Sequence, residues 1–168
     1  HGYAEVSGIP YRMTLIKNKY VGRSFIVPSQ ELREQAVNVK LNALRQNVEG
    51  KRIILIDDSI VRGTTSRRLV TLLREAGAAE VHFRVASPPV AFPCYFGIDI
   101  PNRDELAASR GLDEIREMLG ADSLAYLSVE RLLDSLGDRQ RFCTGCFTGV
   151  YPIAAPVEEQ KMVFEGEV

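Results

Sequence analysis

The chain has 168 residues, enough for one domain with a sizeable hydrophobic core. Its net charge of −1, with 45% hydrophobic and 26% charged residues, is ordinary for a globular protein and does not indicate nucleic acid as a partner. No apolar run approaches the roughly 20 residues that span a bilayer, and three cysteines are too few for a secreted disulfide scaffold. We therefore expect a cytoplasmic protein, kept in reducing surroundings and without a membrane as partner.

The first part of the chain predicts short elements around a basic loop. Residues 2–10 indicate the end of a helix followed by a turn. Because a domain rarely begins inside an element, this start indicates a fragment whose N-terminal part is missing. A strand is predicted over 10–16, and the basic, glycine-containing stretch 17–25 is expected to be a loop. Ser29 is a candidate N-cap for a helix predicted over 30–46, where apolar residues recur at helical spacing.

The middle of the chain predicts a strand, a helix and a second strand. Apolar, partly β-branched residues indicate a strand over 52–57 that is buried on both faces and ends in two carboxylates, Asp57 and Asp58. A loop follows, then an amphipathic helix over 67–76 and an alternating strand over 81–86. A β-α-β repeat predicts a parallel α/β sheet with right-handed crossovers, in which ligands bind beyond the carboxyl ends of the strands.

The last part of the chain predicts shorter elements, whose starts are indicated by N-cap residues. They are a short helix capped by Asn102 with Glu105, a helix from the cap Asp113 to Gly120, a strand over 124–127, a helix over 129–136 after Ser128, and an extended tail over 151–168. We expect one domain over 1–150 followed by that tail. His82, Phe83, Tyr95 and Phe96 are interpreted as packed side chains rather than site residues.

The acidic pair and the loop after it predict a site for a phosphorylated sugar. Backbone N–H groups at the start of the helix suit a phosphate group. The carboxylates of Asp57 and Asp58 suit sugar hydroxyls or a divalent cation. Gly63 allows a close approach of the backbone, and the hydroxyls of Thr64, Thr65 and Ser66 can donate hydrogen bonds. Two adjacent carboxylates alone would be no more than a solvated strand end; the whole block is what indicates a site.

The block Asp57-Asp58-Ser59-Ile60-Val61-Arg62-Gly63-Thr64-Thr65-Ser66 resembles the phosphoribosyl pyrophosphate (PRPP) signature of type I phosphoribosyltransferases, in the form found in amidophosphoribosyltransferases. The resemblance extends through 17–26, 93–99 and 143–149, and leaves only about the last dozen residues unplaced. It implies a parallel-sheet type I phosphoribosyltransferase fold, truncated at the N-terminus, with a C-terminal helical segment that carries cysteines.

The same resemblance implies roles for individual residues. The loop residues Val61, Arg62, Gly63, Thr64 and Thr65 would surround the 5′-phosphate of PRPP, with Ser59 and Ser66 in the same substrate-binding block, and Asp57 and Asp58 would hold the ribose hydroxyls and Mg²⁺. Catalytic contacts are expected from Lys17, Tyr20 and Arg23, in the family's mobile loop that closes over PRPP. Lys19 departs from the family, in which arginine is common, and this weakens only a bidentate contact.

The cysteines carry a second signal. Cys143 and Cys146 form a C-x-x-C pair, which suits zinc, a redox pair or an iron–sulfur cluster, and the spacing alone does not choose among them. One subtype of the family holds a [4Fe–4S] cluster with four cysteines, and Cys94, Cys143 and Cys146 match three of them. The fourth ligand is expected outside this chain.

Amidophosphoribosyltransferases convert PRPP, glutamine and water to 5-phosphoribosylamine, glutamate and pyrophosphate, the first step of purine synthesis. The resemblance therefore implies ammonia from a missing glutaminase domain, purine nucleotides as feedback inhibitors and a homo-oligomer, and the chain alone is expected to be inactive. Two alternatives remain: a regulatory module that binds PRPP or nucleotides on the same fold, and a metal-bound structural or redox protein built on the cysteines. The second leaves the PRPP block unexplained.

Overall fold

The structure, a computed structural model, describes residues 1–17, 41–98, 103–137 and 139–153. Strands and helices alternate along much of that length, as expected of an α/β protein. In chain order they are α1 (Gly2–Ser7), β1 (Leu15–Lys17), β2 (Leu41–Ala43), α3 (Arg45–Val48), β3 (Arg52–Asp57), α4 (Thr64–Glu75), β4 (Glu80–Val85), the 3₁₀ turns η2 (Arg103–Glu105) and η3 (Ala107–Ser109), α5 (Leu112–Leu119), β5 (Ser123–Tyr126), α6 (Val129–Leu136), the 3₁₀ turn η4 (Arg139–Arg141) and α7 (Gly145–Thr148).

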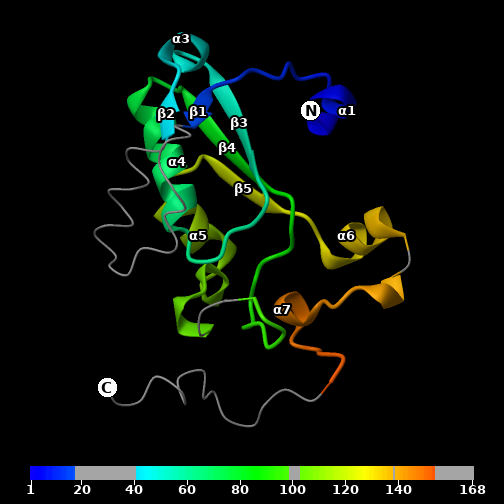
Figure 1. Cartoon of the computed structure of the whole chain (residues 1–168). Helices are drawn as coiled ribbons and strands as arrows, with labels where there is room; N and C mark the ends of the chain where they lie inside the picture. Colours follow the sequence, from blue (N-terminus) through cyan, green and yellow to red (C-terminus); the bar gives the residue numbers. More distant parts are fainter. Residues whose placement is uncertain (18–40, 99–102, 138, 154–168) are drawn as a thin grey trace.

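A parallel sheet in the order β3-β4-β5 lies at the centre of the fold (Figure 1). Its register aligns Asp57 of β3 with Val85 of β4, and Val85 with Tyr126 of β5. The carboxyl ends of all three strands therefore meet at one edge, and the acidic pair lies at that edge. The predicted parallel β-α-β arrangement is confirmed.

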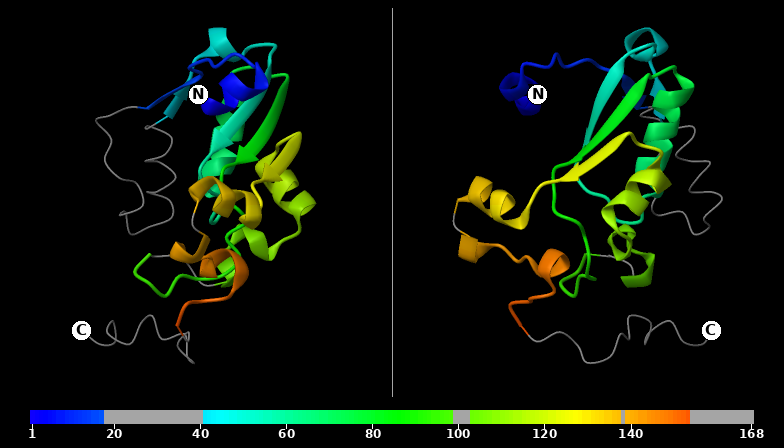
Figure 2. Two further views of the ribbon diagram at one scale, coloured as in Figure 1. Left: turned by 90° about the vertical axis from the view of Figure 1, so that its right-hand side faces the viewer. Right: turned by 180° about the vertical axis from the view of Figure 1, so that it is seen from behind.

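Helices α4 and α5 cover one face of this sheet (Figure 2). Successive side chains of each strand point to opposite faces of the sheet, so every second side chain points toward these helices. Phe83 and Val81 of β4 and Leu73 of α4 have no measurable solvent exposure and lie at the centre of the core. The other buried members include Val48, Leu55, Ile60, Leu69, Val70, Val85, Ala107, Ile115, Leu119 and Leu124.

Helix α4 begins at Thr64 rather than at the predicted Arg67. Gly63 precedes it in the left-handed conformation, with φ 84°, and the buried positions Ser66, Leu69, Val70 and Leu73 form the stripe that faces the sheet. The spacing of that stripe is the one that the sequence predicts. The helix is thus oriented by its apolar face, and its first turn lies at the carboxyl edge of the sheet beside the end of β3.

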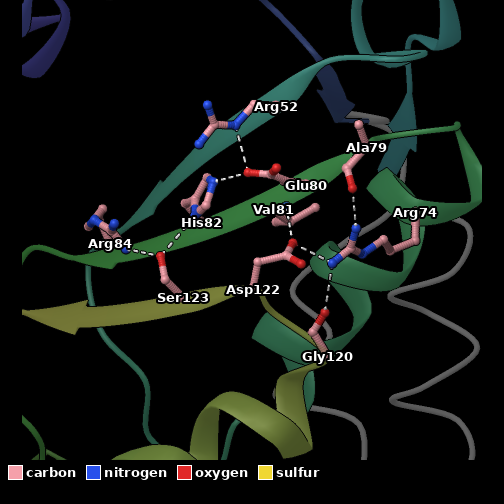
Figure 3. A network of polar contacts seen from close by, with 10 residues as sticks. All are labelled: Arg52, Arg74, Ala79, Glu80, Val81, His82, Arg84, Gly120, Asp122 and Ser123. Atoms are coloured by element: carbon pink, nitrogen blue, oxygen red, sulfur yellow. Dashed lines mark hydrogen bonds and ion pairs between the residues drawn. The ribbon is translucent and has the colours of Figure 1, made fainter.

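A polar clamp secures the opposite, amino edge of the sheet (Figure 3). The guanidinium of Arg74 on α4 donates to the Asp122 carboxylate at 2.5 Å and to the carbonyl oxygens of Ala79 and Gly120. Asp122 also accepts from the backbone N–H of Val81 at 2.6 Å. This backbone hydrogen bond, with the nearby Arg74 guanidinium, lowers the pKa of Asp122. One side chain of α4 therefore ties the turns before β4 and β5 together.

The face of the sheet away from α4 and α5 carries a polar row rather than an apolar one (Figure 3). Glu80 accepts from Arg52 at 2.6 Å and lies 2.8 Å from Nε2 of His82. Nδ1 of His82 lies 2.9 Å from the Ser123 hydroxyl, which also accepts from Arg84. His82, expected as a packed side chain, is thus partly buried and held through both ring nitrogens.

The helix predicted over 30–46 is wrong at its C-terminal end, and residues 30–40 lie outside the described part of the chain. Leu41–Ala43 forms strand β2, which pairs antiparallel with β1, and Leu15 of β1 lies opposite Ala43. Leu15, Leu41 and Ala43 pack against the main core. Apolar spacing in this stretch suits either element, and the partner strand, distant in sequence, decides for the strand. The predicted strand over 10–16 is correspondingly shorter, since it is β1 alone.

Two smaller predictions are also wrong. The cap of α5 is Gly111, whose N–H donates to Glu114, while Asp113 lies inside the first turn. Phe96 is 44% exposed rather than packed in the core, and Tyr95 is only partly buried, in edge contact with Tyr151. Fully buried Phe83 confirms the third aromatic prediction.

Two predicted helix termini are confirmed by their cap geometry. Helix α1 ends at Gly8 in the left-handed conformation, with φ 71°. The hydroxyl of Ser128 accepts from the N–H of Arg131 at 3.3 Å and so caps α6. Among the described residues, no helix combines the length and the apolar character needed to cross a membrane.

Candidate active site

The acidic pair lies where β3 ends. Asp57 is the last strand residue and is partly buried, whereas Asp58 is exposed. Oδ1 of Asp57 accepts from the N–H of Asp58 at 3.1 Å, and Oδ1 of Asp58 accepts from the hydroxyl of Ser59 at 2.9 Å. In the part of the chain that the structure describes, the other carboxylate oxygen of each has no hydrogen-bond partner. Each aspartate thus keeps one oxygen for a ligand.

Asp57 is the more buried of the two carboxylates. Burial raises the pKa of Asp57, the charge of Asp58 raises it further, and the hydrogen bond from the Asp58 N–H lowers it. Burial disfavours the ionised form because water no longer solvates the charge. A bound cation would offset that cost. The arrangement is therefore one in which Asp57 gains from a positive ligand.

The loop after the acidic pair leads directly into the start of α4. The first intrahelical hydrogen bond runs from the N–H of Arg67 to the carbonyl of Gly63 at 2.8 Å. The N–H groups before Arg67 therefore lack intrahelical acceptors, as at any helix start. Thr64 and Thr65 are exposed there, Ser66 is buried at 3% exposure, and the first turn holds no acidic side chain. Amides and hydroxyls are thus available for an anion, and the helix dipole favours it.

The side chains of Met118 and Ala107 lie close to Gly63. A Cβ at this position would lie 2.5 Å from the terminal methyl of Met118 and 3.8 Å from the Cβ of Ala107. Its φ of 84° is also one that side-chain-bearing residues rarely adopt. The turn into α4 therefore favours glycine for its conformation, whereas the Met118 methyl ends a flexible side chain that can move aside.

Two further contacts hold the loop from the side. The carbonyl of Val61 accepts from the N–H of Ala107 at 2.7 Å, and Nε of Arg62 donates to the carboxylate of Glu105 at 2.9 Å. Sequence reasoning did not identify Glu105 and Ala107 as contacts of the loop. Their distance along the chain from the PRPP block leaves no local signal that points to them.

The expected catalytic loop is described only at its first residue. Lys17 is the last residue of β1. Tyr20 and Arg23 lie outside the described residues. The structure therefore brings together the substrate-binding block, from Asp57 to Ser66, and does not test the loop.

The three cysteines gather near the same end of the molecule. Cys94 and Cys146, both partly buried, pack with Val90 and Leu106 in a second small core, and Cys143 is exposed. The sulfurs of Cys94 and Cys143 each accept a backbone N–H at 3.4 Å. Burial, with the nearby thiols of Cys94 and Cys143, raises the pKa of Cys146.

The C-terminal segment folds back over the Cys94 loop. The carbonyl of Cys146 accepts from the N–H groups of Ala91 and Phe92, and the hydroxyl of Tyr151 donates to the Pro93 carbonyl at 2.7 Å. Within the described ranges, no group of three or more His, Cys, Asp or Glu side chains has the arrangement of a metal site. The thiols are neighbours, therefore, without being a formed ligand set.

Comparison with known proteins gives a consistent result, although no protein-family model matches the chain. The chain is 55% identical over 162 residues to an enzyme of Archaeoglobus fulgidus and 59% identical over 157 residues to one of Bacillus subtilis, which covers 94% and 90% of this chain. Both relatives are amidophosphoribosyltransferases.

Solved structures agree with these relatives. A glutamine PRPP amidotransferase from B. subtilis, complexed with ADP and GMP, matches 90% of this chain with a TM-score of 0.77 and 58% identity. A second structure, an allosteric regulatory enzyme of purine biosynthesis, matches with the same TM-score. The parallel α/β fold of the chain is thus that of part of these two enzymes. The chain spans about a third of the length of these curated relatives, 35% and 33% of the first two, and 34% of both solved chains.

Proposed function

We propose that the chain forms the phosphoribosyltransferase part of an amidophosphoribosyltransferase. Ammonia, released when glutamine and water give glutamate, displaces pyrophosphate from the anomeric carbon of PRPP and yields 5-phosphoribosylamine. The observation that carries the proposal is the acidic pair at the end of β3, followed at once by a loop and a helix start with free amides. It occurs in a chain more than half identical to such enzymes.

The residues of this edge suit the chemistry of the reaction. Positive charge builds on the ribose ring as pyrophosphate leaves, so positioning and electrostatic stabilisation supply most of the catalysis. The amides and hydroxyls of Thr64 and Thr65 would hold the 5′-phosphate, and Asp57 and Asp58 the ribose hydroxyls. Bound Mg²⁺ would neutralise charge on the pyrophosphate, and each aspartate keeps one oxygen without a hydrogen-bond partner among the described residues.

The remaining contacts and partners belong to the same proposal. Lys17, Tyr20 and Arg23 would contact the pyrophosphate end of PRPP. Purine nucleotides would act as feedback ligands, for which the support is that a relative has been solved with ADP and GMP. A glutaminase domain would supply ammonia, and the intact protein would assemble as a homo-oligomer.

The proposed activity is tested by pyrophosphate release from PRPP and Mg²⁺ in the intact protein that contains this chain. Release is expected with glutamine and, separately, with an ammonium salt, and the Asp58→Asn variant should lose both. PRPP binding without turnover by either nitrogen source would contradict the enzyme and favour the regulatory module. Absence of PRPP binding would contradict both.

The iron–sulfur subtype is a further part of the proposal, in which Cys94, Cys143 and Cys146 ligate a [4Fe–4S] cluster with a fourth thiolate from outside the 168 residues. The support is that the thiols of Cys94, Cys143 and Cys146 lie near one another where the C-terminal segment meets the Cys94 loop, and that N–H groups donate to two of the sulfurs. Such hydrogen bonds offset the negative charge of ligating thiolates. When bound, the cluster would supply cross-links between the Cys94 loop and α7.

We expect the intact protein, purified without oxygen, to contain iron and sulfide, and the Cys94→Ala variant to lose both, because fewer than four thiolates rarely retain a cluster. The control is Val90→Ala, which removes packing from the same small core without removing a sulfur. Iron and sulfide are measured by colorimetric assay and by visible absorption. An iron-free wild-type protein with full activity would contradict this expectation.

A further inference from the structure

The segment Arg103–Ser109, which contains η2 and η3, contacts the PRPP loop at two consecutive residues. The Ala107 N–H donates to the Val61 carbonyl at 2.7 Å, and the Glu105 carboxylate accepts from Nε of Arg62 at 2.9 Å. The first contact fixes the backbone of the loop. The second directs the cationic side chain of Arg62, which lies between the acidic pair and Gly63 in the sequence.

This segment is itself firmly anchored. Leu106 has no measurable solvent exposure and packs with Val90, Cys94 and Cys146, and the adjacent Ala107 is equally buried within the main core. The turn is closed by the hydroxyl of Ser109, which donates to the Leu106 carbonyl at 2.7 Å. The backbone of Glu105 is therefore held in place beside these two buried residues, while its side chain, 57% exposed, is directed by the hydrogen bond to Arg62.

The geometry leaves part of the Arg62 guanidinium for another partner. Arginine presents five N–H donors in a planar fork, and Nε accounts for one of them. Within the described residues, Glu105 is the one group with a hydrogen bond or ion pair to this guanidinium. Arg62 is itself a residue of the loop whose amides we assign to a phosphate. An arginine held through Nε presents its other donors in a restricted direction, which reduces the rotamer entropy lost when an anion binds.

We propose that Glu105 is a positioning residue that orients Arg62 toward the anionic groups of a phosphoribosyl ligand. The inference rests on the proposed function and assigns to the site an acidic residue outside the PRPP block. Its charge would oppose anion binding if it acted through the field alone, since a carboxylate near a phosphate repels it. An orienting role therefore predicts weaker anion binding when Glu105 is removed, whereas electrostatic repulsion alone predicts tighter binding.

The ion pair contributes little to the fold. Its side chains are 44% and 57% exposed, and exposed pairs are screened by water and salt. Removal of Glu105 is thus expected to leave the melting temperature of the protein unchanged. A loss of PRPP affinity in a variant that melts normally would come from the site and not from unfolding.

The experiment compares Glu105→Ala, Arg62→Ala, the double variant and Asp104→Ala in the intact protein. Asp104 is the matched control, an exposed acid next to Glu105 that has no hydrogen bond or ion pair with the described residues. The readouts are the dissociation constant and KM for PRPP with Mg²⁺, kcat, and the melting temperature. They separate a binding defect from slower chemistry and from loss of folded protein.

We expect Glu105→Ala to raise the KM and the dissociation constant for PRPP by about 5-fold, with unchanged melting and little change in kcat. Asp104→Ala should change neither constant, and the double variant should bind PRPP no more weakly than Arg62→Ala, because Glu105 acts only through Arg62. Equal or tighter PRPP binding by Glu105→Ala, or additive losses in the double variant, would overturn the inference alone. Failure of the wild-type protein to bind PRPP would overturn it together with the proposed function.

Discussion

The Asp57→Asn substitution is expected to reduce Mg²⁺-dependent PRPP affinity by about 10- to 100-fold, which corresponds to about 1.5–3 kcal/mol for a lost charge-assisted contact. Asparagine keeps the oxygen that accepts the Asp58 N–H, so the strand end should stay in place. What disappears is the negative charge that a cation would meet. Calorimetric titration of the intact protein with PRPP, with and without Mg²⁺, measures the loss.

The same substitution should not destabilise the unliganded protein. Burial raises the pKa of Asp57 in the folded state above its ordinary value, so the folded state binds this proton more tightly than the unfolded state. The ionised carboxylate therefore costs stability at neutral pH, and that cost fades as the pH falls through the raised pKa. We expect the melting temperature of Asp57→Asn at pH 7 to equal or exceed that of the wild type.

The control for this prediction is Asp113→Asn on α5, where the side chain is 90% exposed and distant from the PRPP block in sequence. It should change neither PRPP affinity nor its dependence on Mg²⁺. An Asp57→Asn protein with wild-type affinity in the presence of Mg²⁺ would remove Asp57 from the site. A lower melting temperature in Asp57→Asn would contradict the assigned cost of burying its charge.

The Gly63→Ala substitution is expected to lower the free energy of unfolding by about 1–3 kcal/mol, through backbone strain at φ 84°. The added methyl would also force the end of the Met118 side chain to move, since it would lie 2.5 Å from the new carbon. Relief of the backbone strain would displace the turn into α4, so PRPP affinity should fall as well. Urea denaturation and PRPP titration of the same preparation measure the two effects.

Gly111→Ala is the matched control, because Gly111 has a φ of −67° and a Cβ there would meet nothing within 4 Å. Alanine at this position is a poorer N-cap than glycine but restricts the unfolded chain, so stability should change by less than in Gly63→Ala and PRPP affinity should not change. If Gly63→Ala and Gly111→Ala had equal stability and equal PRPP affinity, the assigned preference for glycine before α4 would be wrong.

The central part of the fold was predictable because its signals are local and agree with one another. The strand 52–57, the stripe on α4 and the alternation of β4 each follow from the nearest neighbours in the sequence. Leu41–Ala43 was not predictable in this way. Its apolar residues fit a helix equally well, and the pairing with Leu15–Lys17, distant in the chain, favours the strand.

The candidate site was predictable to the same extent. The PRPP block is contiguous, so its residues had to lie together once β3 and α4 had formed. Glu105 and Met118 reach the loop from distant segments that carry no motif, and periodicity or spacing cannot reveal such contacts. The gathering of Cys94 with Cys146 was expected only from the family resemblance, because the C-x-x-C spacing specifies no third partner.

The amino end of the sheet stabilises the fold, whereas the carboxyl end carries the candidate site. This difference determines how variants of the protein would behave in a cell. At the amino end, Arg74 and Asp122 bind one another and the backbone, so a change there acts on the amount of folded protein. At the carboxyl end, Asp58 is exposed and keeps one oxygen without a hydrogen-bond partner among the described residues, so its substitution acts on ligand occupancy at constant protein abundance. Substitutions of Arg74 or Asp122 should therefore be rescued by chaperones or lower temperature, and a substitution of Asp58 should not.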